Sequence, residues 1–267
     1  MKRYWMLKGA ALVLCAGLLQ FAAAPAGAQT PATQPATAPS RAPTEPADQP
    51  APKTDKTGKI QARFEQMHES FLKRAKDGPI GVLFLGDSIT EGWARSAGAQ
   101  AIWDKYYGKD QPANFGIGGD QTQHVLWRID NGELDGISPK VLVLMIGTNN
   151  IHYSADHILA GDTRIVEEIH AKLPNTKLLL LGIFPRGAKA SDPNVDEMRQ
   201  KIKTVNQGLA KLDDGGKTTR YLDIGDKFLD AEGNIDPSIM KDALHPTAKG
   251  YQIWADAMQT TLDDLLK

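Results

Sequence analysis

Apolar residues gather in five short runs in this 267-residue chain, and each run has the length of a single strand. The third run, Val-Leu-Val-Leu-Met-Ile, is continuous rather than alternating, as in a parallel strand that is buried on both faces. We therefore predict five buried strands. They cover residues 81–85, 113–117, 141–146, 178–183 and 221–224.

Between these runs, apolar residues recur at spacings of three and four, which is the period of an amphipathic helix. Alternation of strands and helices favours an α/β fold, with a parallel sheet covered by helices on both faces. The residue pattern leaves the order of the strands open. The predicted helices cover residues 60–76, 121–131, 155–173, 196–211 and 247–266.

The N-terminus has the pattern of a secretory signal peptide over residues 1–28. Basic residues precede an apolar stretch, and Ala-Gly-Ala at residues 26–28 is typical of a cleavage site. A membrane anchor is the alternative, but the apolar stretch is short for a spanning helix. We therefore expect a secreted or periplasmic protein, with no stable membrane insertion after cleavage.

Cys15 is the only cysteine in the chain, and it falls within the predicted signal peptide. The bulky Leu14 before it disfavours lipid attachment. We therefore expect a mature domain without disulfides, which depends on its core for stability.

Residues 29–57 are rich in Pro, Ala and Thr and contain almost no large apolar side chain. Such a segment cannot bury a core, so we predict a disordered linker followed by a folded domain over residues 58–267. The linker either holds the domain away from an envelope component or has no function of its own. The formal net charge of −1 argues against nucleic acid or an anionic membrane surface as the main partner.

Candidate chemistry begins with Gly86-Asp87-Ser88, at the end of the first apolar run. A serine at a sharp turn from strand to helix presents its hydroxyl at the carboxyl edge of the sheet, where open α/β folds place their chemistry. The pattern is not the G-x-S-x-G elbow, because Thr90 stands where the second glycine would be. The alternative is a serine that only caps a helix.

Two further blocks follow the second and third runs. In residues 114–120, three glycines allow a tight turn, and Asp120 is expected to cap a helix that starts near residue 121. Backbone N–H groups at such a turn suit a developing oxyanion, and a phosphate-binding turn is the alternative. Asn149 and Asn150 follow the third run, where a side-chain amide can donate into the same site or can simply stabilise a turn.

The last block is Asp242-Ala-Leu-His245-Pro246. Pro246 disfavours helix here, so the carboxylate of Asp242 can fold back onto the imidazole of His245. That contact would fix the ring tautomer and leave the far nitrogen free to take a proton from a serine hydroxyl. The alternative is a surface loop with two polar residues.

Taken together, the four blocks resemble the SGNH branch of the GDSL esterase/lipase family, over roughly residues 81–265. The resemblance implies a three-layer α/β/α, flavodoxin-like fold with strand order 2-1-3-4-5. It implies Ser88 as nucleophile, with His245 as base and Asp242 as its partner. It also implies an oxyanion hole formed by the N–H groups of Ser88 and Gly119 and the side-chain amide of Asn149.

Within that family, residues 114–134 look like the catalytic subunits of intracellular platelet-activating factor acetylhydrolase, and Pro-Arg-Gly at residues 185–187 adds to the likeness. Ile89, Thr148 and Leu244 are expected to crowd the nucleophile and to favour a small acyl group such as acetyl. The other histidines lack metal-ligand spacing, so we expect neither metal nor cofactor.

We therefore predict an exported serine esterase that acts on short acyl esters, such as those of an O-acetylated carbohydrate. A lysophospholipase or short-chain lipase is the alternative enzyme. A catalytically silent, envelope-binding module and a nucleotide or flavin binder are alternatives of other classes, although Asp87 and Glu91 would repel a phosphate. The sequence does not indicate an oligomeric state.

Overall fold

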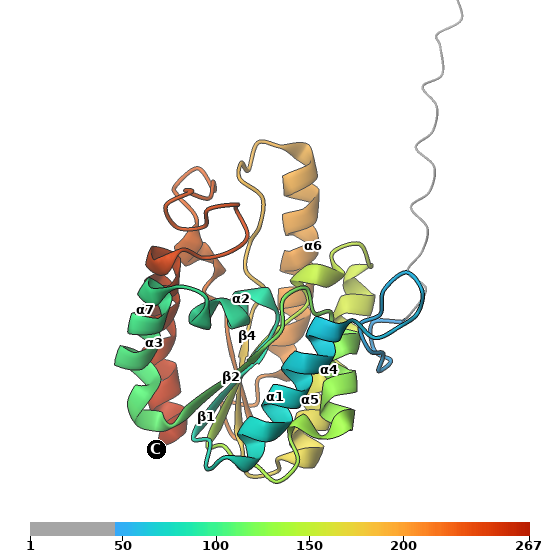
Figure 1. Ribbon diagram of the computed structural model, residues 1–267. Coiled ribbons are helices and arrows are strands. Elements are labelled where there is room, and N and C mark those ends of the chain that lie inside the picture. The colour runs from blue at the N-terminus through green and yellow to red at the C-terminus, as the bar shows by residue number, and fades with distance from the viewer. Residues whose placement is uncertain (1–45) are drawn as a thin grey trace, which may run out of the picture. The chain divides into compact units, whose positions relative to one another are not determined.

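A computed structural model describes residues 46–267. The predicted signal peptide, residues 1–28, and much of the predicted linker lie outside the described residues. Five parallel strands form one sheet in the order β2-β1-β3-β4-β5 (Figure 1), so the expected strand order is confirmed. The strands are β1 (Val82–Gly86), β2 (Pro112–Gly116), β3 (Val141–Met145), β4 (Lys177–Leu181) and β5 (Thr219–Leu222).

Helices cover both faces of the sheet, which gives three α/β/α layers (Figure 1). One face carries α3 (Ala97–Tyr107) and α7 (Ala248–Leu266). The other face carries α1 (Ala62–Lys76), α4 (Thr122–Arg128), α5 (Ala155–Lys172) and α6 (Pro193–Leu209). The short helical turns are α2 (Ser88–Glu91), η1 (Gly92–Ala94), η2 (Gly108–Asp110), η3 (Ile129–Glu133), η4 (Thr148–Asn150), η5 (Ala210–Leu212) and η6 (Gly225–Phe228).

Side chains of each strand alternate between two hydrophobic cores, because successive residues of a strand point to opposite faces. In β1, Val82 and Phe84 join the core under α3 and α7, while Leu83 and Leu85 join the other core. Both cores are closed to solvent, so all of β1 is buried and its apolar run is continuous. Because β1 pairs in parallel with both β2 and β3, the carboxyl ends of these three strands lie at the same edge of the sheet.

One helix, α3, was absent from the sequence-based prediction. Ser96 caps it by accepting a hydrogen bond from Ala99 N at 3.2 Å, and its buried face carries Trp103 and Tyr107. This helix has few large aliphatic residues, so its sequence shows only a weak helical period of apolar side chains. Helix α6 begins at Pro193, earlier than the predicted residue 196, because Asp192 caps it.

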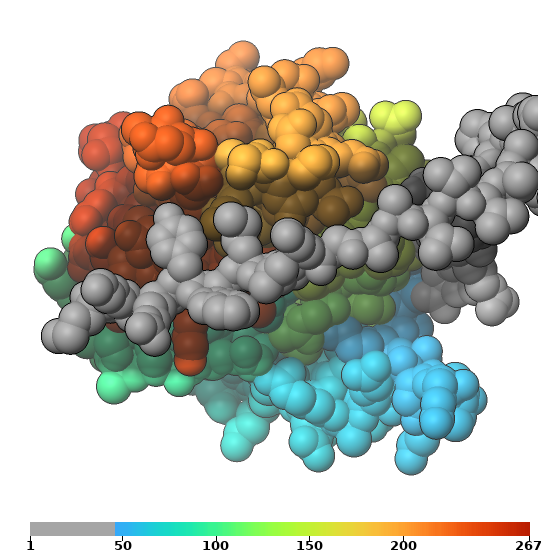
Figure 2. Space-filling model, turned by 90° about the horizontal axis from the view of Figure 1, so that it is seen from above, coloured from blue at the N-terminus to red at the C-terminus, as the bar shows by residue number. Residues whose placement is uncertain are grey.

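The N-terminal strap, which we define as residues 46–61, departs from the expected linker. Ala47 is fully buried, and its carbonyl oxygen accepts a hydrogen bond from Thr122 Oγ1 at 2.7 Å. Ala51 N donates to Gln123 O at 3.0 Å, which fastens the strap to α4. Figures 1 and 2 show this blue segment beside green ones. The packed domain therefore includes residues before 58, since small residues and main-chain bonds suffice to dock them.

No helix within residues 46–267 is both long enough and apolar enough to cross a membrane.

Gly116, at the carboxyl end of β2, sets how closely α2 can approach the sheet. A Cβ atom added there would lie 2.2 Å from the backbone nitrogen of Glu91. We expect Gly116→Ala to lower the free energy of unfolding by about 1–3 kcal/mol, the usual effect of overpacking, as measured by urea denaturation. Gly108→Ala is the control, because a Cβ atom there would meet no atom within 4 Å. Equal stability of the two variants would contradict this account.

Candidate active site

Ser88 is the first residue of α2 and directly follows the turn that ends β1. The cap of this helix is Asp87, whose Oδ1 accepts a hydrogen bond from Ile89 N at 2.9 Å. Ser88 therefore is not the capping residue, and its hydroxyl faces another partner. The side chain is largely buried but reaches the surface at the carboxyl edge of the sheet, as the sequence predicted.

That partner is His245, from the loop before α7. Ser88 Oγ lies 2.9 Å from His245 Nε2, and His245 Nδ1 lies 2.6 Å from Asp242 Oδ2. The other oxygen of Asp242 accepts the backbone N–H groups of His245 at 2.8 Å and Leu244 at 3.2 Å. Ala243 has a φ of +54°, an uncommon value for a residue with a side chain. The loop is thus bent so that Asp242 turns back onto the imidazole ring.

Asp242 is held in its charged form. Desolvation acts to raise its pKa, but the hydrogen bonds from the side chain and backbone of His245 outweigh this, and the pKa of Asp242 is lowered. A carboxylate that stays ionised can keep the Nδ1 proton of His245 and leave Nε2 as an acceptor toward Ser88.

The glycine block forms a tight turn beside Ser88. Asp120 N donates to Ile117 O at 3.1 Å, and Gly119 has a φ of +76°. Gly118 N donates to Glu91 Oε2 at 2.6 Å. Gly118 and Gly119 both line the cleft that holds Ser88, so the turn lies where the sequence placed it.

The two asparagines after β3 have separate tasks. Asn149 lines the cleft, and its amide nitrogen donates to Asp120 O at 2.8 Å and, at the longer distance of 3.4 Å, approaches Asp87 Oδ2. Asn150 is fully buried and accepts a hydrogen bond from Thr122 N at 3.0 Å. Asn149 alone therefore faces the site, while Asn150 fixes the turn to α4.

The cleft around Ser88 has a volume of about 370 Å³. Of the three residues expected to crowd the nucleophile, Leu244 lines this cleft. Ile89 instead packs in the core under α3 and α7, because its side chain points away from the cleft on α2. Thr148 is buried, and its carbonyl oxygen accepts from Arg186 Nη1 at 2.9 Å. The lining residues are Arg63, Ser88, Arg95, Gly118, Gly119, Asn149, Leu244 and His245.

Two lining residues, Arg63 and Arg95, were not found from the sequence. Both are about half exposed, and both pair with Glu91, Arg95 through Nη2 to Oε2 at 2.9 Å. The spacing of Glu91 and Arg95, four residues apart on successive helical turns, is a weak signal that could have indicated their pairing. No pattern in the sequence connects Arg63 with this site, because it comes from α1.

Asp120 does not cap α4, contrary to expectation. The capping residue is Gln121, and Asp120 is fully buried between two cations. Its carboxylate lies 2.7 Å from Lys53 Nζ and 3.0 Å from Arg128 Nε. Burial raises the pKa of Asp120, and these two cations oppose that shift. Asp120 is thus an ion-pairing residue, and its backbone N–H closes the glycine turn.

Arg128 continues this buried network. Its guanidinium donates to Phe115 O at 3.0 Å and to Gly86 O at 3.3 Å, at the ends of β2 and β1. It also pairs with Glu133 at 2.7 Å, and Glu133 in turn contacts His68 Nδ1 at 2.8 Å. Arg128 therefore has a structural position, bound to two strand ends and to two carboxylates.

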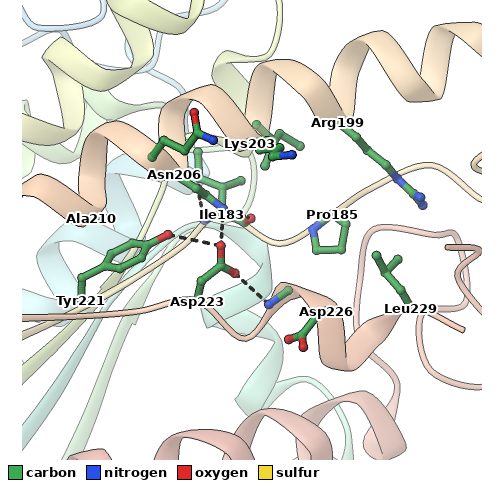
Figure 3. A pocket seen from close by; sticks show the side chains of 13 residues that line it. Ile183, Pro185, Arg199, Lys203, Asn206, Ala210, Tyr221, Asp223, Asp226 and Leu229 are labelled. Atoms are coloured by element: carbon green, nitrogen blue, oxygen red, sulfur yellow. Dashed lines mark hydrogen bonds between the residues drawn. The ribbon is translucent and has the colours of Figure 1, made fainter. Parts of the chain in front are cut away.

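A larger cleft, of about 640 Å³, lies between α6 and the segment from β5 to η6 (Figure 3). Asp223 in its wall accepts hydrogen bonds from Asn206 Nδ2 at 3.1 Å and Gly225 N at 2.9 Å. None of its lining residues is Ser, Cys or His, and none lines the cleft at Ser88. It therefore has neither the serine or cysteine nucleophile nor the histidine base that the cleft at Ser88 requires.

Within residues 46–267, no group of three or more His, Cys, Asp or Glu side chains is arranged to hold a metal ion.

Comparison with known proteins identifies the relatives of this chain. The GDSL-like Lipase/Acylhydrolase family model matches residues 84–253. The rat platelet-activating factor acetylhydrolase IB subunit alpha2 is 39% identical over 193 residues, which are 71% of this chain and 79% of the relative. The bovine subunit alpha1 is 34% identical over 204 residues, 76% of this chain and 84% of the relative.

Among solved structures, a GDSL-like lipase of Bacteroides thetaiotaomicron has the same fold, with a TM-score of 0.59 at 21% identity. The match covers 74% of this chain and 97% of that one.

Asp87 is expected to make the folding stability of the protein depend on pH. Its complete burial raises its pKa to about 7, despite the hydrogen bond from Ile89 N. A folded-state pKa above the unfolded value of about 3.9 means that Asp87 contributes stability below pH 4, which is lost as pH rises through 7. We expect Asp87→Asn, which stays neutral, to be stabilised relative to wild type above pH 7 by up to roughly 4 kcal/mol.

The measurement is the difference in melting temperature between Asp87→Asn and wild type from pH 4 to pH 8. The values at pH 4 are the internal control, since Asp87 is protonated there and resembles asparagine. A difference that stays constant across this range would contradict the buried, titrating carboxyl.

Proposed function

The chain belongs to the GDSL-like lipase/acylhydrolase family and is a carboxylic ester hydrolase, and we propose that it is an exported serine acetylesterase. The observation that carries the proposal is the continuous chain of contacts from Ser88 through His245 to Asp242, at the turn after β1. An activated serine, a base and an orienting acid are the parts that ester hydrolysis by acyl transfer requires.

In the proposed reaction, Ser88 Oγ attacks the ester carbonyl carbon while His245 Nε2 takes its proton. The 2.9 Å contact between these atoms supports that transfer. The protonated imidazole then gives the proton to the leaving alkoxide, and the acyl group stays on Ser88. Water, deprotonated by the same nitrogen, releases the acid and restores Ser88.

We assign the oxyanion hole to the N–H groups of Ser88 and Gly119 and to the Asn149 amide. One hydrogen of that amide goes to Asp120 O, and the other makes only the 3.4 Å approach to Asp87. A substrate oxyanion can replace this long contact. Each such donor typically contributes about 3–4 kcal/mol to the transition state.

The acyl group is proposed to be acetyl. Leu244 lines the cleft directly beside His245, where it limits the room for a chain. The relatives at 34–39% identity are named acetylhydrolases, which supports the same choice. We retain only Leu244 as the acyl-limiting residue, since Ile89 and Thr148 are buried away from the cleft.

For the alcohol portion, we propose an O-acetylated carbohydrate, on the expectation that the protein is exported. A phospholipid ester is the second candidate. It is favoured by Arg63 and Arg95, two cations with one carboxylate between them at the mouth of the cleft. A phosphate near the scissile ester would complement that excess positive charge.

Ser88→Ala should fold like wild type and lose ester hydrolysis, because Ser88 carries the only hydroxyl or thiol among the residues that line the cleft. Loss of a triad member costs up to about 10⁶-fold in kcat in well-studied enzymes. The measurement is hydrolysis of 4-nitrophenyl acetate together with labelling by a fluorophosphonate probe, which requires an activated serine. Asp242→Asn is the comparison variant and should be impaired by up to about 10⁴-fold through the wrong histidine tautomer.

Retention of more than a few per cent of activity by Ser88→Ala would exclude Ser88 as nucleophile. Absence of both hydrolysis and labelling in the wild type would instead favour the silent binding module.

Acetyl esters should have a higher kcat/KM than octanoyl esters, because a longer chain must displace Leu244, and overpacking costs about 1–3 kcal/mol. Leu244→Ala should extend the range to butyryl and hexanoyl esters. The measurement is a chain-length profile of 4-nitrophenyl esters for both proteins, with acetyl turnover as the control that His245 keeps its place. A wild-type optimum at eight carbons or more would favour the lipase instead.

A further inference from the structure

The turn from Ile117 to Asp120 is a tight β-turn whose type depends on the orientation of one peptide unit. Its 3.1 Å hydrogen bond and the φ of +76° at Gly119 are those of a type II turn. A type I turn differs from it mainly by a flip of the central peptide unit, which here joins Gly118 to Gly119. Glycine tolerates both conformations, so the residues of the turn do not by themselves select one.

The direction of the Gly119 N–H depends on this choice. No cis peptide bond occurs among residues 46–267, so the Gly118 carbonyl and the Gly119 N–H point in opposite directions. A contact that holds the carbonyl oxygen on one side of the turn therefore aims the N–H toward the other side. A flip would turn an oxygen toward the place assigned to the oxyanion and remove a donor from it.

Lys53, from the N-terminal strap, makes that contact. Its Nζ donates to Gly118 O at 2.8 Å and lies 2.7 Å from Asp120 Oδ1. Its side chain is only 12% exposed, and its ammonium group lies 5.6 Å from the centre of the Phe64 ring. The strap holds it in place, because Gln61 N donates to Lys53 O at 2.9 Å. A cation that is largely shielded from solvent thus binds the carbonyl side of the turn.

The other side of Gly118 is held as well. Its N–H donates to Glu91 Oε2 at 2.6 Å, and Arg95 fixes that carboxylate. Both peptide units next to Gly118 are therefore fastened by charged side chains, whose hydrogen bonds are stronger than those of neutral groups.

We propose that Lys53 is a positioning residue for catalysis: it selects the type II form of the 117–120 turn and aims the Gly119 N–H at the oxyanion. The proposal rests on the proposed function, in which Gly119 is an oxyanion donor. Lys53 also polarises the peptide unit it binds, which strengthens the N–H as a donor. Lys53 lies outside residues 84–253, the part of the chain that matches the family model.

The test must separate this role from charge balance, because Lys53 also neutralises the buried Asp120. We would compare Lys53→Met, Asp120→Asn and the double variant Lys53→Met/Asp120→Asn, with Lys56→Met as the control from an exposed part of the strap. The double variant removes both charges, so its stability should recover toward wild type. It still lacks the bond to Gly118 O. Should Lys53→Met fail to fold, the double variant carries the test against Asp120→Asn.

For 4-nitrophenyl acetate, Lys53→Met and the double variant should lose about ten- to a thousandfold in kcat, up to the loss seen when an oxyanion donor is removed, with KM within about twofold. Lys56→Met should match wild type. A kcat for Lys53→Met within twofold of wild type would overturn the proposal. So would recovery of kcat in the double variant, which would assign Lys53 to charge balance alone.

A second readout needs no activity. The ¹⁵N resonance of Gly119 responds to hydrogen bonding at the preceding carbonyl, so Lys53→Met should shift it, while Lys56→Met should not. An unchanged Gly119 resonance would overturn the positioning role. Because this measurement uses protein without substrate, it is unaffected if Ser88→Ala shows the proposed function to be wrong.

Discussion

The buried guanidinium of Arg128 is the group around which the carboxyl edge of the sheet is organised. It has no exposed surface, and it binds the carbonyl oxygens of Gly86 and Phe115 at the ends of β1 and β2. It also pairs with Asp120 and Glu133. Leaving such a charge without partners costs about 3–5 kcal/mol, so two strand ends, the glycine turn and η3 must all reach it in the folded protein.

Two kinds of parts meet at this edge. The Asp242–His245 loop is almost self-contained, since the acid and the imidazole it orients are three residues apart. Ser88, in contrast, lies 157 residues from His245 along the chain. β1 ends beside the loops that follow its two neighbours in the sheet, β2 and β3, which carry the glycine turn and Asn149. The His245 loop follows β5, and it reaches Ser88 because α7, which comes directly after it, packs in the same core as β1. The packing of the sheet and helices thus brings the catalytic residues close together, and the local turns orient their side chains.

Charged groups that are placed to act indirectly surround this site. Glu91 accepts a hydrogen bond from the N–H of Gly118, and Lys53 donates one to the carbonyl oxygen of Gly118. Asp87, the residue before Ser88, has a raised pKa because it is fully buried. In so small a cleft, buried charges orient main-chain dipoles without themselves occupying space that a substrate needs. Two charged residues at or beside the cleft, Lys53 and Arg63, precede residues 84–253, which match the family model.

The sequence alone determined the five strands, the α/β class and the positions of Ser88 and the Asp242–His245 pair. Those features depend on the period at which apolar side chains recur and on residues that are neighbours in the chain. Both can be read directly from the sequence. The strand order came only through resemblance, because no local pattern reports which strands lie side by side. The fold and that order are confirmed.

Tertiary structure decided the rest. It buried Ile89 in the core, gave the cap of α4 to Gln121, and docked residues 46–57 where composition predicted a free linker. It also placed Lys53 against Gly118 across 65 residues. Such contacts join single residues that are far apart in the chain, so they repeat with no period and leave no local signal. These contacts form only when folding brings distant parts of the chain together.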